Sequence, residues 1–131
     1  MEANAKDRFM REICRHAGIE EFRELVYEMV EIISSNGFSV CCRNDIDQSV
    51  IEWSNYLIRI YVPINPSRNL GSLWSLLHET GHLVNGNNGP SKQSELEAWK
   101  FAQNIVERSF PDLVKMFLAY KDNCLKSYGV L

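Results

Sequence analysis

Residues 69–84 constrain the fold more than any other segment, because they predict a helix with little polar surface. Large apolar side chains fall on nearly every side of the helical projection, whereas a surface helix confines them to one stripe. Such a helix has to be covered all round, so we expect it at the centre of the molecule. The apolar residues are Leu70, Leu73, Trp74, Leu76, Leu77, Leu83 and Val84.

The same helix carries the segment His78-Glu79-Thr80-Gly81-His82. Positions i and i+4 share a helix face, so His78 and His82 can reach one ion, and neutral imidazole is a good zinc ligand. Glu79 can take a proton from a water molecule as a general base. Glycine inside a helix costs ~1 kcal/mol relative to alanine, so Gly81 predicts that another element packs closely there.

A hydrolytic zinc site needs a third protein ligand and an open fourth position. His16, the remaining histidine, lies far away in the sequence and is expected to be an ordinary surface or core residue. Glu95 and Glu97 lie roughly 200° apart around a helix, so only one of them can face the metal. Glu95 continues an apolar stripe, whereas Ser94 and Glu97 fit a capping box. We therefore expect Glu95 as the third ligand, with Glu97 as the alternative.

The rest of the chain predicts an α+β fold with about five helices and three strands. In the last strand, Tyr56, Ile58, Ile60 and Val62 are expected to share one face. Alternation with one mixed face is typical of an antiparallel sheet covered on one side. Asparagine and glycine in residues 85–90 predict a break between helices. The predicted helices span residues 5–17, 20–35, 69–84, 91 or 94 to about 109, and 111–126, and the predicted strands span 38–43, 50–53 and 56–62.

Length and composition favour a single domain over residues 1–131, since 131 residues with 45% hydrophobic content can bury a core. We expect no membrane span, because no run of 18 apolar residues occurs. The charged, polar N-terminus lacks the apolar segment of an export signal, so the cytoplasm is the expected location. A net charge of −3 without a Lys/Arg-rich run disfavours direct nucleic-acid binding.

In order and spacing, these motifs resemble the gluzincin metallopeptidases, and within them the ImmA/IrrE-like group. The likeness is carried by His-Glu-x-Gly-His at 78–82, the glycine-rich turn, Glu95-Leu96-Glu97-Ala98 and the small sheet before the metal helix, over roughly residues 20–110. It implies a minimal zincin-like fold with the motif on a buried central helix. It also implies one Zn²⁺ held by His78, His82 and Glu95, with Glu79 as general base. Two histidines and a glutamate favour zinc over manganese or iron.

The resemblance further implies a cytoplasmic protease acting on a protein substrate, in this group often a helix-turn-helix repressor of a stress response or mobile element. Trp99 departs from the pattern, because related proteins often carry Asp or Asn directly after the alanine, where it supports a ligand histidine. The alternative expectation is a metal-stabilised protein-interaction module of the same fold without proteolytic activity.

Two features of catalysis stay open in the sequence. An exposed strand beside the metal helix, either 50–53 or 56–62, is expected to bind substrate by strand addition. Stabilisation of the developing oxyanion needs a further donor. The tyrosine candidates for that donor are Tyr56, Tyr61, Tyr120 and Tyr128.

Overall fold

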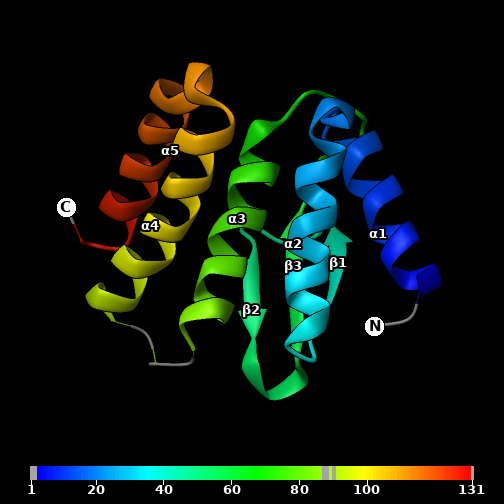
Figure 1. Cartoon of the computed structure of the whole chain (residues 1–131), viewed down its shortest axis with the longest axis horizontal. Helices are drawn as coiled ribbons and strands as arrows, with labels where there is room; N and C mark the ends of the chain where they lie inside the picture. The colour runs from blue at the N-terminus through cyan, green and yellow to red at the C-terminus, as the bar shows by residue number, and fades with distance from the viewer. Residues whose placement is uncertain (1–2, 87–88, 90, 131) are drawn as a thin grey trace.

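The computed structural model describes residues 3–86, 89 and 91–130. In this part of the chain the predicted α+β class with five α-helices is confirmed, with helix ends moved by a few residues (Figure 1). None of these helices is long and apolar enough to cross a membrane. The helices are α1 (Ala3–His16), α2 (Arg23–Ser35), α3 (Leu70–Asn85), α4 (Lys92–Ser109) and α5 (Val114–Ser127), and the strands are β1 (Ser39–Arg43), β2 (Val50–Glu52) and β3 (Leu57–Tyr61).

The apolar helix α3 lies at the centre, as its sequence predicts. Figure 1 shows α3 between the α4–α5 pair on one side and α1, α2 and the sheet on the other. It packs most extensively against α4, and also contacts α2, α5, β2 and β3. Leu73, Leu76 and Leu77 are fully buried, because neighbours cover every side of the helix. The buried apolar side chains of helices and sheet form one connected core.

The sheet is mixed, so the expected antiparallel sheet is wrong. Its strand order is β1-β3-β2, with β1 parallel to β3 and β2 antiparallel to β3. Burial explains why β3 takes the middle position: Ile58 and Ile60 are fully buried, whereas Val50 of the three-residue β2 is 38% exposed. Successive strands alternate in direction both in the expected antiparallel sheet and in the observed mixed sheet. Periodicity along each strand therefore does not reveal which pair of strands is adjacent.

Tyr56 does not join the buried face of β3. It ends the short 3₁₀ turn Trp53–Asn55 with a left-handed φ of +51°, and it is 63% exposed. Its ring lies against Phe38, with the ring centroids 5.5 Å apart. The left-handed residue interrupts the alternation, so only the apolar residues after it follow the predicted buried face.

Helix α4 begins before the predicted capping box, which does not form. Ser91 is the N-cap, and its Oγ accepts a hydrogen bond from the Ser94 backbone N–H at 3.0 Å. Glu97 instead accepts a hydrogen bond from Gln93 Nε2 at 2.8 Å. The predicted break begins after Asn85, where α3 ends, and residues 87, 88 and 90 of that segment lie outside the described residues.

Gly81 allows α3 and α4 to approach closely, as its position inside the helix predicts. A Cβ at Gly81 would lie 2.6 Å from the carbonyl oxygen of Ala98 and 3.1 Å from its Cα. Those are backbone atoms of a helix, so they cannot rotate away from an added methyl group. The contact sets the N-terminal turns of α4 beside the 78–82 segment of α3.

Candidate metal centre

Two helices bring the three predicted ligand residues together. His78 and His82 lie one turn apart on α3, and Glu95 lies in the first turn of α4. His78 Nε2 is 2.9 Å from Glu95 Oε2, and His82 Nε2 is 3.1 Å from Glu95 Oε1. One candidate ligand atom from each residue lies within 4.8 Å of the other two. Glu97 is outside this group, and His16 ends the distant helix α1.

The donor set suits a zinc ion, which binds imidazole nitrogen and carboxylate oxygen in tetrahedral sites. Bonds of about 2.0–2.2 Å in tetrahedral geometry place neighbouring ligand atoms about 3.4 Å apart. That spacing lies between the hydrogen-bonded distances and the 4.8 Å span of the group, so small side-chain rotations are enough to admit the ion. The His82 and Glu95 side chains keep 14% and 20% exposure, which leaves the group reachable from solvent.

Hydrogen bonds within the site shift the pKa values of His78 and Glu95. Burial alone would lower the pKa of His78, but hydrogen bonds with Glu79 and Glu95 outweigh it and raise that pKa to about 9. Burial would raise the pKa of Glu95, but hydrogen bonds from His78 and His82 lower it to about 2. A charged imidazole therefore faces the Glu95 carboxylate. A metal ion bound by the same atoms would replace the proton on His78.

Glu79 is a buried carboxylate beside the ligand group but outside it. Its Oε1 lies 3.3 Å from Nδ1 of His78, so each ring nitrogen of His78 faces a carboxylate. A carboxylate at the second nitrogen fixes the orientation of a ligand histidine. Glu79 also lines two cavities, one extending toward α5 and one toward β2. Its carboxylate thus borders both a ligand histidine and the space open to a bound molecule.

Trp99 supports His78 by packing. It occupies the position where the ImmA/IrrE-like proteins often carry Asp or Asn. Its ring stacks on the imidazole with centroids 4.1 Å apart and planes within 10°. Trp99 is 1% exposed, and its indole Nε1 is buried without a hydrogen-bond partner among the described residues. Trp99 follows Glu95 by four positions, so the two share a face of α4. The stacking of Trp99 on His78 was not predicted, but this four-residue spacing from Glu95 is the feature of the sequence that could have indicated it.

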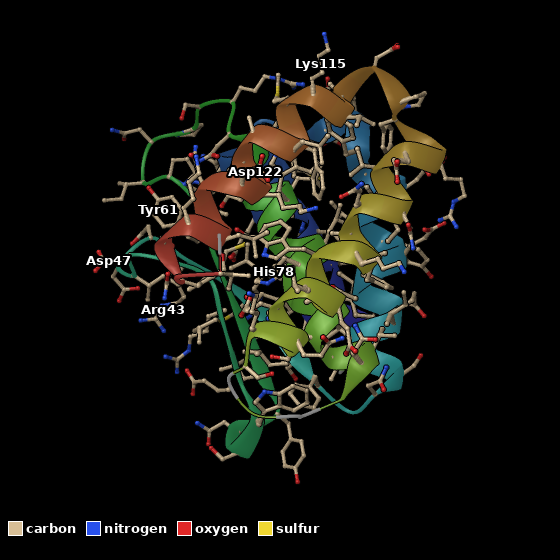
Figure 2. The ribbon with its side chains drawn as sticks, turned by 90° about the vertical axis from the view of Figure 1, so that its left-hand side faces the viewer. Arg43, Asp47, Tyr61, His78, Lys115 and Asp122 are labelled. Carbon is tan, nitrogen blue, oxygen red and sulfur yellow. The ribbon has the colours of Figure 1, made fainter. Side chains whose placement is uncertain are left out.

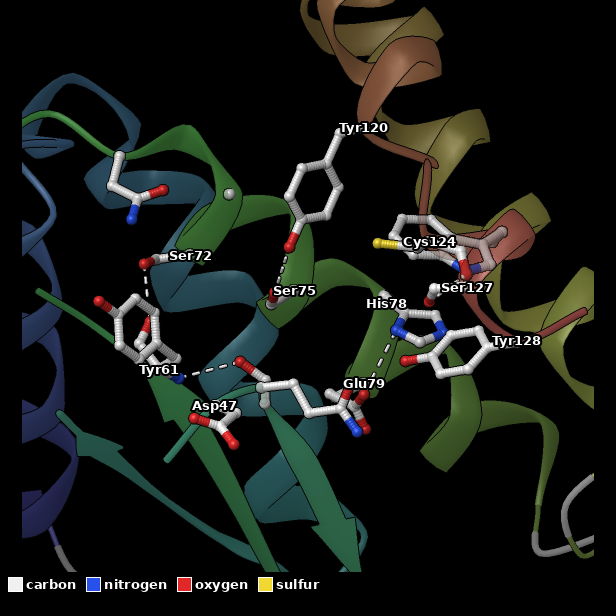
Figure 3. Close-up of a pocket in the computed structure, with 15 residues that line it drawn as sticks. Asp47, Tyr61, Ser72, Ser75, His78, Glu79, Tyr120, Cys124, Ser127 and Tyr128 are labelled. Carbon is white, nitrogen blue, oxygen red and sulfur yellow. Dashed lines mark hydrogen bonds and ion pairs between the residues drawn. The ribbon is translucent and has the colours of Figure 1, made fainter. Parts of the chain in front are cut away.

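A cavity of about 230 Å³ adjoins His78 and Glu79 between α3, α5 and the segment before β2 (Figure 3). Tyr61, Tyr120 and Tyr128 line this cavity, whereas Tyr56 lies away from it. The Tyr120 hydroxyl is hydrogen bonded to Ser75 Oγ at 3.1 Å. Tyr128 also lines the second cavity, together with His82 and Glu95. Tyr128, like Glu79, therefore lines both cavities.

The centre combines three convergent ligand residues, a buried carboxylate outside the ligand set and an adjoining cavity. These are the parts required for metal-assisted hydrolysis, in which a general base works beside the ion. Comparisons of the chain with models of protein families, with curated proteins and with solved structures found no match.

Substitution of Glu95 is expected to separate the two candidate third ligands. Glu95→Gln removes the charged oxygen donor, so zinc affinity should fall on the order of 100-fold or more. Glu97→Gln is the matched control, because it alters a carboxylate on the same helix that bonds only to Gln93 among the described contacts. Competition with a chromogenic chelator measures both affinities. A large loss in Glu97→Gln with little change in Glu95→Gln would contradict the assignment.

Proposed function

We propose that the chain is a zinc-dependent metallopeptidase of zincin-like fold, which hydrolyses a peptide bond of a protein substrate in the cytoplasm. The observation that carries the proposal is the position of Glu79. Its carboxylate is buried, lies beside His78, and borders both cavities next to the ligand group. Orienting His78 needs only the contact with Nδ1, whereas the exposure of the same carboxylate to both cavities also places it where a bound molecule can reach it.

Each residue of the site has a distinct role in this proposal. His78, His82 and Glu95 hold the ion. When bound, zinc supplies Lewis acidity, which polarises a carbonyl group and makes water more acidic. The carboxylate of Glu79 accepts a proton from the attacking water and returns it to the amine nitrogen that leaves. Stacking on Trp99 keeps the His78 ring in place during both transfers.

The edge strand β2 supports binding of an extended peptide. The strand order β1-β3-β2 leaves one side of β2 without a partner strand in the described sheet. Val50 and Ile51 line the second cavity together with Glu79, His82 and Glu95. A peptide paired with the free side of β2 would therefore run past the ligand group, with main-chain hydrogen bonds holding it. By its resemblance to the ImmA/IrrE-like group, we propose a repressor protein as the substrate.

Glu79→Gln is expected to abolish peptide cleavage while zinc stays bound. The amide cannot accept the proton from water, and general-base catalysis contributes about 10²–10⁴-fold. Zinc content by elemental analysis and cleavage of a peptide library by mass spectrometry would be measured on the same preparations. Full activity in Glu79→Gln with bound zinc would rule out the proposed role. Bound zinc with no cleavage by the wild type would favour the interaction module.

Tyr128 is the tyrosine best placed to stabilise the oxyanion. Figure 3 shows it beside His78 and Glu79, at the end of α5. Burial, together with the nearby carboxylates of Glu95 and Glu79, raises the pKa of Tyr128 to about 12, so its hydroxyl keeps the proton that it would donate. Tyr120 is less suited, because its hydroxyl already bonds to Ser75.

Tyr128→Phe is expected to lower kcat on the order of 100-fold, the usual cost of removing one oxyanion donor. KM and zinc content should change little, because the aromatic ring is retained and no ligand is altered. Tyr120→Phe provides the matched control and should retain most of kcat. Steady-state kinetics on one cleaved peptide measures both variants. Equal kcat in Tyr128→Phe and the wild type would exclude Tyr128 as the donor.

A further inference from the structure

The cavity beside Glu79 has a mixed apolar and polar wall, in which two of the side chains are carboxylates. Hydroxyl and amide groups from α3, α5 and the segment before β2 line it together with aromatic rings, and no lysine or arginine is among its described lining residues. Its carboxylates are Asp47 and Glu79. Figure 3 shows Asp47 at the end of the cavity away from His78, next to Tyr61. The proposed metal centre therefore lies at one end of the cavity and an aspartate at the other.

Asp47 has a negative charge that no neighbouring arginine neutralises. Arg43, the nearest basic residue in the sequence, pairs with Asp45 at 2.6 Å, and Arg59 of β3 pairs with Glu52 at 2.8 Å. Asp47 forms no ion pair within the described part of the chain. Figure 2 shows Asp47 at the periphery of the molecule and His78 in the interior. A side chain entering from the metal end would therefore meet an unpaired carboxylate at the outer end.

The lining selects among the chemical classes of side chain that could enter. An apolar side chain can pack against the aromatic rings of the wall, but it gives the Asp47 carboxylate no ion-pair partner. An acidic side chain would approach two carboxylates with no lysine or arginine beside them. A cationic side chain packs its aliphatic part against the same rings, donates hydrogen bonds to the hydroxyl and amide oxygens, and forms an ion pair with Asp47. A volume of about 230 Å³ accommodates one long side chain.

We propose that this cavity is a specificity subsite for a lysine or arginine side chain adjacent to the cleaved bond, and that Asp47 selects for its positive charge. The substrate class is thus a protein with a basic residue next to the scissile peptide bond. The inference rests on the proposed peptidase function, but binding of a single side chain can be measured without cleavage.

The binding test uses two amino-acid derivatives with the same number of side-chain carbons, Nα-acetyl-lysine amide and Nα-acetyl-norleucine amide, titrated into the 131-residue protein. NMR shifts of backbone amides around Asp47 and Ser75 report occupancy. The lysine derivative should bind about tenfold more tightly, since it adds a charge-assisted hydrogen bond. Asp47→Asn should remove that difference. Asp45→Asn is the matched control and should retain it, because Asp45 pairs with Arg43 and does not line the cavity.

Cleavage provides the second test. In a peptide library, wild type should prefer lysine or arginine over norleucine at one position beside the cut, by about tenfold in kcat/KM. Asp47→Lys should reverse the preference toward glutamate at that position. Equal binding of the two derivatives, or cleavage indifferent to charge, would overturn the subsite. Selective lysine binding without any cleavage would keep the subsite and reject the peptidase function.

Discussion

The close approach of α4 to α3 at Gly81 and Ala98 is the contact on which the candidate site depends. Both histidines come from α3, but Glu95, the third candidate ligand, belongs to α4, so the distance between the two helices decides whether the three side chains can meet. With the Ala98 carbonyl oxygen 2.6 Å from where a Cβ would lie, only glycine permits that approach without movement of the helix backbone. Glu95, one turn before Ala98, then reaches both imidazoles.

The same helix contact explains how His78 is held. Trp99 follows Ala98 directly and lies flat against the His78 ring, while Glu79 faces the Nδ1 atom. Stacking on Trp99 and the contact between Nδ1 and Glu79 orient the His78 ring so that its Nε2 atom points at Glu95. The position where the ImmA/IrrE-like group often carries a polar residue is thus used for stacking. Trp99 holds the His78 ring by stacking, without a hydrogen bond from its indole nitrogen to any described residue.

Local patterns in the sequence predicted the features that depend on one helix or one strand. The i, i+4 histidines, the glycine between them and the buried character of α3 all follow from spacing within a single element. Features that depend on how distant segments meet were not predictable in the same way. The position of β3 between β1 and β2 depends on relative burial of whole strands. The helix cap is a local feature that was nevertheless predicted wrongly, because Ser91 caps α4 three residues before Ser94. Asp47 is left without an ion pair among the described residues because Arg43 pairs with Asp45 and Arg59 pairs with Glu52, and the sequence does not reveal these pairings.

The central claim is that His78, His82 and Glu95 together bind one zinc ion. X-ray absorption spectroscopy at the zinc edge, on wild-type protein loaded with one equivalent of zinc, tests it most directly. The account predicts a first shell of nitrogen and oxygen at about 2.0–2.2 Å, with the outer-shell scattering of two imidazole rings. A sulfur scatterer at about 2.3 Å, which Cys124 in the neighbouring cavity wall could supply, would contradict it, as would the absence of imidazole scattering.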